Sequence, residues 1–243
     1  MDARSVQMAT ILVSAGIGYE WSFEEAFLSR DGPAPVSLVA CDASVSPTRF
    51  FWRALRRVAA AAFSPTRARE RLANARWNLE RARAFRRFFY GPGRTFHRNF
   101  LGPSTGGRSL SIGDLLDRLP AGSGHHVFVK LDIEGDEYDI VPEIVRRAPM
   151  FSGLVIEWHA LDHRWGAFSQ CMDALREHFD VVHVHGNNYR PLIPGTSVPA
   201  VLEMSLAHKA LVGARPLSSG STYPIEGLDW PCNPARPDYP LTF

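Results

Sequence analysis

The sequence predicts an α/β fold in which helices cover a mostly parallel β-sheet on both faces. Short apolar, β-rich runs alternate along the chain with segments whose apolar residues recur at helical spacing. The first of these runs ends in a glycine turn that leads into a helix, and several later runs end in acids or histidines. Strand ends of this kind form the ligand-binding edge of open α/β sheets. The sequence therefore predicts both a fold and the edge that carries its site.

Seven stretches fit strands, and the last two follow each other without a long crossover, so the last strand should run antiparallel. The predicted strands are Thr10–Ala15, Pro35–Cys41, Thr95–Leu101, Val127–Asp132, Gly153–His159, Asp180–His185 and a run within Val198–Lys209. The predicted helices of the sheet layers are Ser22–Ser29, Ser109–Leu119, a segment after Asp132 that ends near Arg147, and Trp165–Phe179.

An arginine-rich segment, residues 46–100, separates the second strand from the middle of the sheet. It has fourteen arginines and two acids, a net charge of +12, which leaves −10 on the rest of the chain. Two amphipathic patterns, Phe51–Ala62 and Leu72–Phe85, predict a helical insertion. A solvated lid or cap and a surface for an anionic partner are both open. This insertion lies within the predicted α/β domain, residues 1–213, and a Pro-rich irregular tail is predicted for residues 214–243.

Composition excludes several classes of protein. With 45% hydrophobic and 11% aromatic residues, the 243-residue chain is not wholly disordered. No apolar run is long enough to span a membrane and no secretory signal pattern is present, so we expect a cytoplasmic protein. The three cysteines, Cys41, Cys171 and Cys232, are far apart, and reduced thiols are expected rather than disulfides or a CxxC metal site.

The first strand runs into Gly16 and Gly18, where the backbone could approach a ligand closely. Ser22 and Glu25 have the spacing of a capping box that would begin the next helix. The dinucleotide fingerprint lacks its third glycine, so an ordinary tight turn is the alternative. Asp42 ends the second strand, where Rossmann-like folds bind ribose hydroxyls. Its alternative role is to cap the loop together with Ser44 and Ser46.

The later strand ends carry the candidate catalytic groups. Asp132 and Glu134 follow the strand Val127–Asp132, although both could instead favour the N-terminus of the next helix, together with Asp136 and Glu137. Glu157 and His159 alternate along one strand, so a structural hydrogen-bonded pair is as good a hypothesis as catalysis. His185 ends a further strand, where a satisfied structural histidine is the commoner case.

Three stretches resemble the FkbM-like methyltransferases: SAGIGYEWSFEEAF, VKLDIEG and HVHGNNY. The resemblance implies a Rossmann-like class I methyltransferase fold, a seven-stranded sheet with an antiparallel last strand. It implies S-adenosyl-L-methionine (SAM) as cofactor and O-methylation of a small-molecule or glycan acceptor, such as a sugar or a polyketide. Gly16 and Gly18 would lie near the methionine part of SAM, Asp42 would bind its ribose, and Asp132 would lie near the methyl group. The candidates to accept the proton would be Glu134, Glu157, His159 and His185.

Three alternatives remain open. The same acids and histidines could gather around a divalent metal ion, although nothing in their spacing demands it. The chain could instead be a non-catalytic binding protein on a methyltransferase-like scaffold. Residues 46–100 would then hold an anionic partner such as a phosphate group, a nucleic acid or an acidic carrier protein. The third alternative is a nicotinamide-dependent enzyme, which the incomplete glycine motif disfavours.

Overall fold

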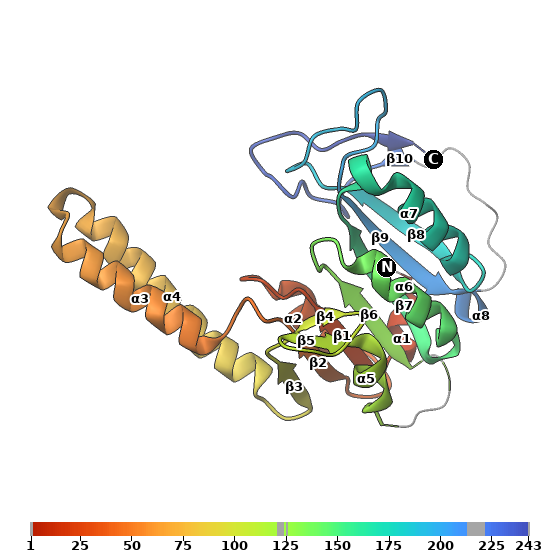
Figure 1. Ribbon diagram of the computed structural model, residues 1–243, viewed down its shortest axis with the longest axis horizontal. Helices are drawn as coiled ribbons and strands as arrows, with labels where there is room; N and C mark the ends of the chain where they lie inside the picture. The colour runs from red at the N-terminus through yellow and green to blue at the C-terminus, as the bar shows by residue number, and fades with distance from the viewer. Residues whose placement is uncertain (1, 121–123, 125, 213–221, 243) are drawn as a thin grey trace.

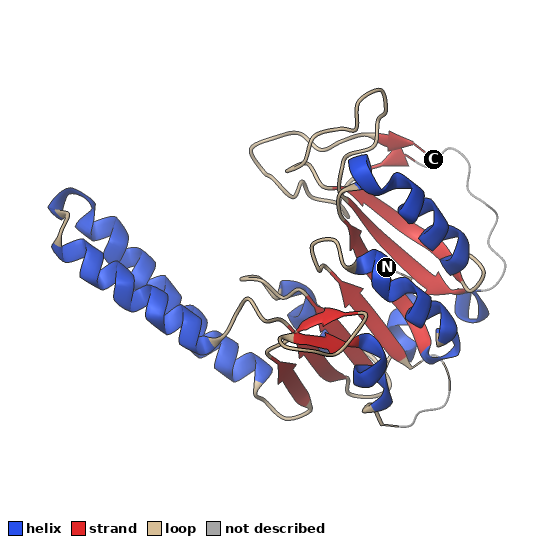
Figure 2. Cartoon of the chain, viewed as in Figure 1, coloured by secondary structure: helices blue, strands red, loops and turns tan. Residues whose placement is uncertain are grey.

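The computed structural model describes residues 2–120, 124, 126–212 and 222–242. They form a seven-stranded sheet between two layers of helices, and a helical hairpin projects away from this body (Figures 1 and 2). No helix among these residues is both long enough and apolar enough to cross a membrane.

The strands of the large sheet lie in the order β3-β2-β1-β6-β7-β9-β8. Neighbouring strands are parallel, except that β9 inserts antiparallel between β7 and β8. This order and the reversed last strand confirm the predicted Rossmann-like class I methyltransferase fold. The strands are β1 (Ile11–Ala15), β2 (Ser37–Cys41), β3 (Arg94–His97), β6 (Val127–Leu131), β7 (Phe151–Trp158), β8 (Phe179–Gly186) and β9 (Leu202–His208).

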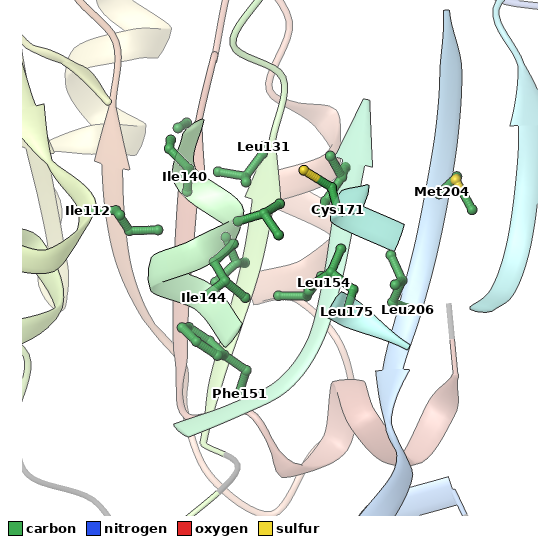
Figure 3. Packing of buried hydrophobic residues seen from close by; sticks show 14 of the residues in the cluster. Ile112, Leu131, Ile140, Ile144, Phe151, Leu154, Cys171, Leu175, Met204 and Leu206 are labelled. Carbon is green, nitrogen blue, oxygen red and sulfur yellow. The ribbon is translucent and has the colours of Figure 1, made fainter. Parts of the chain in front are cut away.

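The two faces of the sheet carry separate hydrophobic cores, because side chains alternate along each strand. On β6, Val129 and Leu131 face one core, whereas Phe128 faces the other. The first core joins the sheet to three helices, as Figure 3 shows for Ile144 and Leu175 among others. These helices are α5 (Ile112–Asp117), α6 (Glu137–Arg146) and α7 (Leu161–Leu175).

The second core joins the sheet to α2 (Ser22–Leu28) and to the base of the hairpin. The hairpin, called the arm below, consists of α3 (Pro47–Ala62) and α4 (Ala68–Phe89), joined by a 3₁₀ turn at Pro65–Arg67. At its base, Phe50 and Phe85 are buried, and Phe85 packs edge-on to Trp21. Twelve of the arginines lie in residues 47–89. The arm is therefore anchored by aromatic packing while its far end is exposed (Figure 1).

The helical insertion is shorter than predicted. Arg94–His97, inside the predicted range 46–100, forms β3 and pairs with β2 in the large sheet. The insertion thus fills the crossover from β2 to β3 and ends with α4. The strand predicted as Thr95–Leu101 is thus present but lies at Arg94–His97, while Phe100 and Leu101 belong to a separate short strand, Phe100–Gly102. Three residues of β3 are half-buried and one is exposed, so it has little apolar pattern of its own.

The predicted capping box of Ser22 and Glu25 is wrong. Trp21 occupies the N-cap position of α2 and makes no side-chain capping bond, so Ser22 is already helical. Glu20 Oε1 instead accepts the amide protons of Trp21 and Ser22, both at 3.1 Å. Glu25 accepts the indole proton of Trp21 at 3.0 Å. The side chain that caps the start of α2 is therefore that of Glu20 and not that of Ser22.

The rest of the chain connects these parts. Of the predicted tail, residues 214–221 and 243 lie outside the described part, and residues 222–242 are irregular except for one short strand pair. Leu241 of that pair is buried in the first core, so the tail closes over the sheet. The remaining elements are α1 (Ala3–Met8), β4 (Phe100–Gly102), β5 (Ser109–Ser111), a 3₁₀ turn at Ala148–Met150, α8 (Lys209–Val212), β10 (Thr222–Tyr223) and β11 (Leu241–Thr242).

Candidate active site

A pocket of about 270 Å³ opens at the carboxyl ends of β1, β2 and β6. Its volume is near the lower end of small-molecule sites. The four residues predicted to bind the cofactor all line it, although they come from three different strand ends. The lining residues are Gly16, Gly18, Cys41, Asp42, Ser44, Phe100, Leu101, Asp132, Ile133, Glu134 and Asp136.

The two glycines of the turn after β1 meet different structural requirements. A Cβ atom on Gly16 would lie 1.6 Å from the carbonyl oxygen of Asp132, so the tips of β1 and β6 touch backbone to backbone. Gly18 has a φ of +57°, and a Cβ there would meet no atom within 4 Å. Gly16 therefore serves the packing of the strands, and Gly18 is the glycine that leaves space beside the pocket.

Asp42 combines both roles that the sequence left open. Its buried carboxylate accepts the amide protons of Ile17 and Gly18, each at 2.9 Å, through Oδ2. Oδ1 accepts the amide proton of Ser44, so Asp42 does cap the loop. Ser46 takes no part, because its hydroxyl caps α3. The carboxylate thus fixes the glycine turn while it lines the pocket, and it keeps little capacity for further bonds.

Lys130 stabilises the same turn, and the sequence analysis did not identify it as a site residue. Its ammonium group donates to the carbonyl oxygen of Gly16 at 2.7 Å and lies 3.8 Å from Oε1 of Glu24. Glu24 is completely buried on α2 and accepts the Ser14 hydroxyl proton at 2.5 Å. A partly buried charge pair therefore supports the floor of the pocket.

The turn after β6 is held by Glu137, the first residue of α6. Glu137 is completely buried, and its Oε1 atom accepts the amide protons of Ile133 and Gly135, each at 3.2 Å. Glu134 has a φ of 58°, and its side chain is 78% exposed. Glu137 does lie in the first turn of α6, as the predicted alternative had it, but its carboxylate binds the turn before the helix rather than amides of the helix start.

His159 lies beside this turn. Its Nδ1 atom is 2.8 Å from Oε1 of Glu137, and its Nε2 atom is 3.8 Å from Oδ1 of Asp132 and 3.7 Å from Oε2 of Glu134. Burial lowers the pKa of His159, but the hydrogen bond and charge of Glu137 and the charges of Glu157 and Glu134 outweigh it and raise the pKa to about 9. His159 pairs with Glu137, not with Glu157 as the structural alternative proposed.

Glu157 is not among the residues that line the pocket, but it interacts with Asp132, which does. Burial, followed by the charges of Asp132 and Glu203, raises the pKa of Glu157 to about 8. Its Oε1 atom accepts a proton from the Asn187 side chain at 2.7 Å. A buried carboxyl group with so high a pKa, next to a second carboxylate, is typical of catalytic sites.

His185 is engaged elsewhere. Its Nδ1 atom lies 3.2 Å from Glu203, and its Nε2 atom lies 2.8 Å from Asp238 in the C-terminal tail. Hydrogen bonds with Cys232 and Glu203, opposed by burial, raise the pKa of His185 to about 11. A charged, doubly bound imidazole fits a structural clamp on the tail better than a proton acceptor, which is the commoner case that the sequence allowed.

Neighbouring residues extend this clamp. His183 Nε2 lies 2.8 Å from Asp229, and the Asn188 amide donates to three tail carbonyl groups. The HVHGNNY stretch therefore holds the tail, with Asn187 as its link to Glu157. The sequence showed the motif but not its partners, because those lie about forty residues or more away in an irregular segment.

Two groups of described residues have metal-ligating atoms that all lie within 4.8 Å of one another: Asp132 with Glu134 and His159, and His185 with Glu203 and Cys232. Phe100 and Leu101 add an apolar wall to the pocket that the sequence did not indicate, because they come from β4, outside the large sheet.

The known proteins that this chain resembles are distant. No protein-family model and no curated protein matches the sequence. Precorrin-6y C5,15-methyltransferase from Geobacter metallireducens is 14% identical, covering 84% of this chain and 86% of that chain, with a TM-score of 0.37. A putative S-adenosylmethionine-dependent methyltransferase from Listeria monocytogenes is 10% identical, covering 83% and 92%, with a TM-score of 0.38. The strand order establishes the fold without them, and the FkbM-like resemblance stays a prediction.

Proposed function

We propose that this protein is a SAM-dependent methyltransferase that acts on a hydroxyl group. One observation carries the proposal: Gly18, Asp42 and Asp132, from three neighbouring strand ends of a class I methyltransferase sheet, line a single pocket. In such sheets the ligand lies outside the carboxyl ends of the strands.

The pocket suits the chemical parts of SAM. Its acidic side, with Asp132, Glu134 and Asp136, would stabilise the positively charged sulfonium and amino groups. Its apolar side, with Phe100 and Leu101, would contact the adenine ring. Asp42 would act mainly by holding the Gly18 turn in place, with its remaining lone pair available to a ribose hydroxyl.

The chemistry requires one proton acceptor. When the methyl group moves, the sulfur–carbon bond breaks with its electrons staying on sulfur, a carbon–oxygen bond forms, and the acceptor hydroxyl loses its proton. SAM supplies the leaving group, so the protein must align the reactants and receive that proton. Glu157, with a pKa of about 8, is the best candidate base, because it is partly ionised near neutral pH and binds a proton well. Asp132, Glu134 and His159 would orient the acceptor.

The proposal is tested by incubating the full chain with methyl-labelled SAM and hydroxyl acceptors, namely sugars, polyketide alcohols and phenols. We expect S-adenosylhomocysteine to form together with a methyl ether. Glu157→Gln should lower kcat by about 10²-fold or more, as for other general bases, and should leave the Kd for S-adenosylhomocysteine within about twofold of the wild type, since the cofactor contacts remain. Methyl transfer only to nitrogen or carbon would contradict the O-methylation proposal.

A second candidate function, binding of an anionic partner by the arm, is favoured by a specific cleft. This cleft of about 640 Å³ lies between α3, α4 and the turn after Gly18. Its lining residues are Tyr19, Arg53, Arg56, Arg57, Ala60, Asn74, Trp77 and Asn78. The guanidinium of Arg53 lies 4.7 Å from the ring centre of Tyr19. Asn78 is only 7% exposed, and its Oδ1 atom has no hydrogen-bond partner among the described residues.

Three arginines, two aromatic rings and an unused amide oxygen suit a phosphate-bearing ligand that also carries a hydrogen-bond donor. Titrations with inorganic pyrophosphate and a single-stranded oligonucleotide at rising salt test this candidate. We expect affinity to fall steeply with salt and Arg56→Ala to weaken binding several-fold. Arg83→Ala, an exposed arginine of the same arm outside the cleft, is the matched control. Equal effects of the two substitutions would contradict a defined site.

A further inference from the structure

Asp132, Glu134 and His159 form a compact set of ligating atoms on the wall of the pocket. Two of them follow β6 and the third follows β7, and their ligating atoms all lie within 4.8 Å of one another. We propose that these three side chains bind a divalent metal ion. Two oxygens and one imidazole nitrogen favour Mn²⁺ over Mg²⁺ and Ca²⁺, which prefer oxygen ligands alone.

The distances are close to those that an ion requires. His159 Nε2 lies 3.8 Å from Oδ1 of Asp132 and 3.7 Å from Oε2 of Glu134. In an octahedral Mn²⁺ site with bonds of about 2.2 Å, neighbouring ligands are about 3.1 Å apart. The two distances from His159 would therefore have to shorten by about 0.6–0.7 Å on binding. Glu134 is 78% exposed, so its side chain can move toward the ion.

The orientation of His159 is the independent observation. Its side chain is only 10% exposed, and its Nδ1 atom is hydrogen-bonded to the completely buried Glu137 at 2.8 Å. Its Nε2 atom makes no hydrogen bond within the described residues and faces the two carboxylates. A carboxylate on one imidazole nitrogen, with the other nitrogen facing the ion, is the usual support of a metal-binding histidine. Binding of the ion would release the proton that Nε2 carries near neutral pH.

The second candidate group lacks this feature. Both ring nitrogens of His185 have carboxylate partners, Glu203 and Asp238, and the Cys232 thiol donates to Glu203 at 3.1 Å. Its groups thus satisfy one another without an ion, so we propose no metal there. The two groups are alike in the closeness of their ligating atoms. They differ because His159 has a ring nitrogen without a hydrogen bond among the described residues, whereas His185 does not.

A metal ion at this site would also have a role in the proposed methyl transfer. Three protein ligands leave coordination positions open, and Asp132 and Glu134 line the pocket proposed for the methyl donor, next to which the acceptor would lie. A hydroxyl oxygen bound to a divalent ion loses its proton more easily. The acceptor would then be a molecule that offers hydroxyl oxygens to the ion. This use rests on the proposed methyltransferase function, whereas binding of the ion does not.

The experiment is a titration of the full chain with Mn²⁺, followed by calorimetry and by the electron paramagnetic resonance of the free ion, with no SAM present. We expect one site per chain in the wild type, with at least tenfold weaker binding in Glu134→Gln. That side chain is 78% exposed, so the substitution leaves the core intact. His159→Gln should also weaken binding at least tenfold.

Asp162→Asn is the matched control, because it removes one negative charge nearby without removing a ligand. Asp162, at the start of α7, lies 3.3 Å from the exposed His163 and contributes to the electrostatics around Tyr138. We expect Mn²⁺ affinity within about twofold of the wild type, because a single surface charge acts weakly in water. No Mn²⁺ binding by the wild type, or an equal loss in Asp162→Asn and Glu134→Gln, would overturn the proposal.

A parallel titration with S-adenosylhomocysteine in the presence of a chelator separates this inference from the proposed function. Cofactor binding without Mn²⁺ binding would refute the metal site alone. Mn²⁺ binding without cofactor binding would support the metal site and count against the methyltransferase.

Discussion

The carbonyl oxygen of Asp132 occupies the position that a Cβ atom of Gly16 would need, at a separation of only 1.6 Å. The tips of β1 and β6 therefore meet with no room for a side chain, and the pocket begins where these two strands touch. This contact makes the first glycine of the turn a structural requirement.

We expect Gly16→Ala to destabilise the protein by about 3 kcal/mol or more, because the strand tips must separate and the residue has a φ of +78°. Urea unfolding measures the effect. Gly18→Ala is the matched control: its φ is +57° but the space around it is open, so it should cost only about 1 kcal/mol. Equal losses in the two variants would mean that the strand tips can separate freely.

Lys130→Met should leave Glu24 buried without its cation and should release the carbonyl group of Gly16. Removing one partner of a buried pair costs about 3–5 kcal/mol. The two side chains are 15% and 1% exposed, so solvent screens the pair little. The double variant Lys130→Met with Glu24→Gln should recover part of the loss, because no buried charge then remains unpaired. Additive losses measured by urea unfolding would show that the two residues do not interact.

The clamp at His185 makes stability depend on pH. Its hydrogen bonds with Cys232 and Glu203 raise the pKa from 6.5 to about 11, so folded His185 keeps a proton that the unfolded chain loses. The stabilisation is complete below pH 6.5 and is lost as the pH rises toward 11. We expect the melting temperature of the wild type to fall more over this window than that of His185→Gln. Burial also raises the pKa of the Cys232 thiol, so Cys232→Ser is measured beside it. Parallel profiles of wild type and His185→Gln would show that the clamp carries no charge.

The fold could be predicted because its signals are local. Apolar runs such as Thr10–Ala15 and Val127–Asp132 show strands without knowledge of their neighbours, and the short last connection shows the antiparallel strand. β3 was predicted with inexact bounds, as Thr95–Leu101, since an edge strand of four residues behind a long insertion has little pattern of its own. Its role as a sheet member follows from pairing with β2, which is a tertiary contact.

The site was predictable where one strand end supplies one residue. Asp42 and Asp132 could be found in this way, because parallel strands bring their carboxyl ends to one edge. Lys130 could not, since a half-buried lysine next to a turn resembles an ordinary surface residue in sequence. Glu137 was expected only as an acid at a helix start, and its bonds to the turn after β6 are tertiary contacts that no local pattern records. The role of His185 depends on Asp238, fifty-three residues away in the tail, and no local pattern records that pairing.

The most direct test of the central claim, that the pocket at β1, β2 and β6 binds the methyl donor, is a calorimetric titration of the full chain with S-adenosylhomocysteine. We expect saturable binding with one site per chain. A well-folded sample that takes up no S-adenosylhomocysteine at millimolar concentration would contradict the claim.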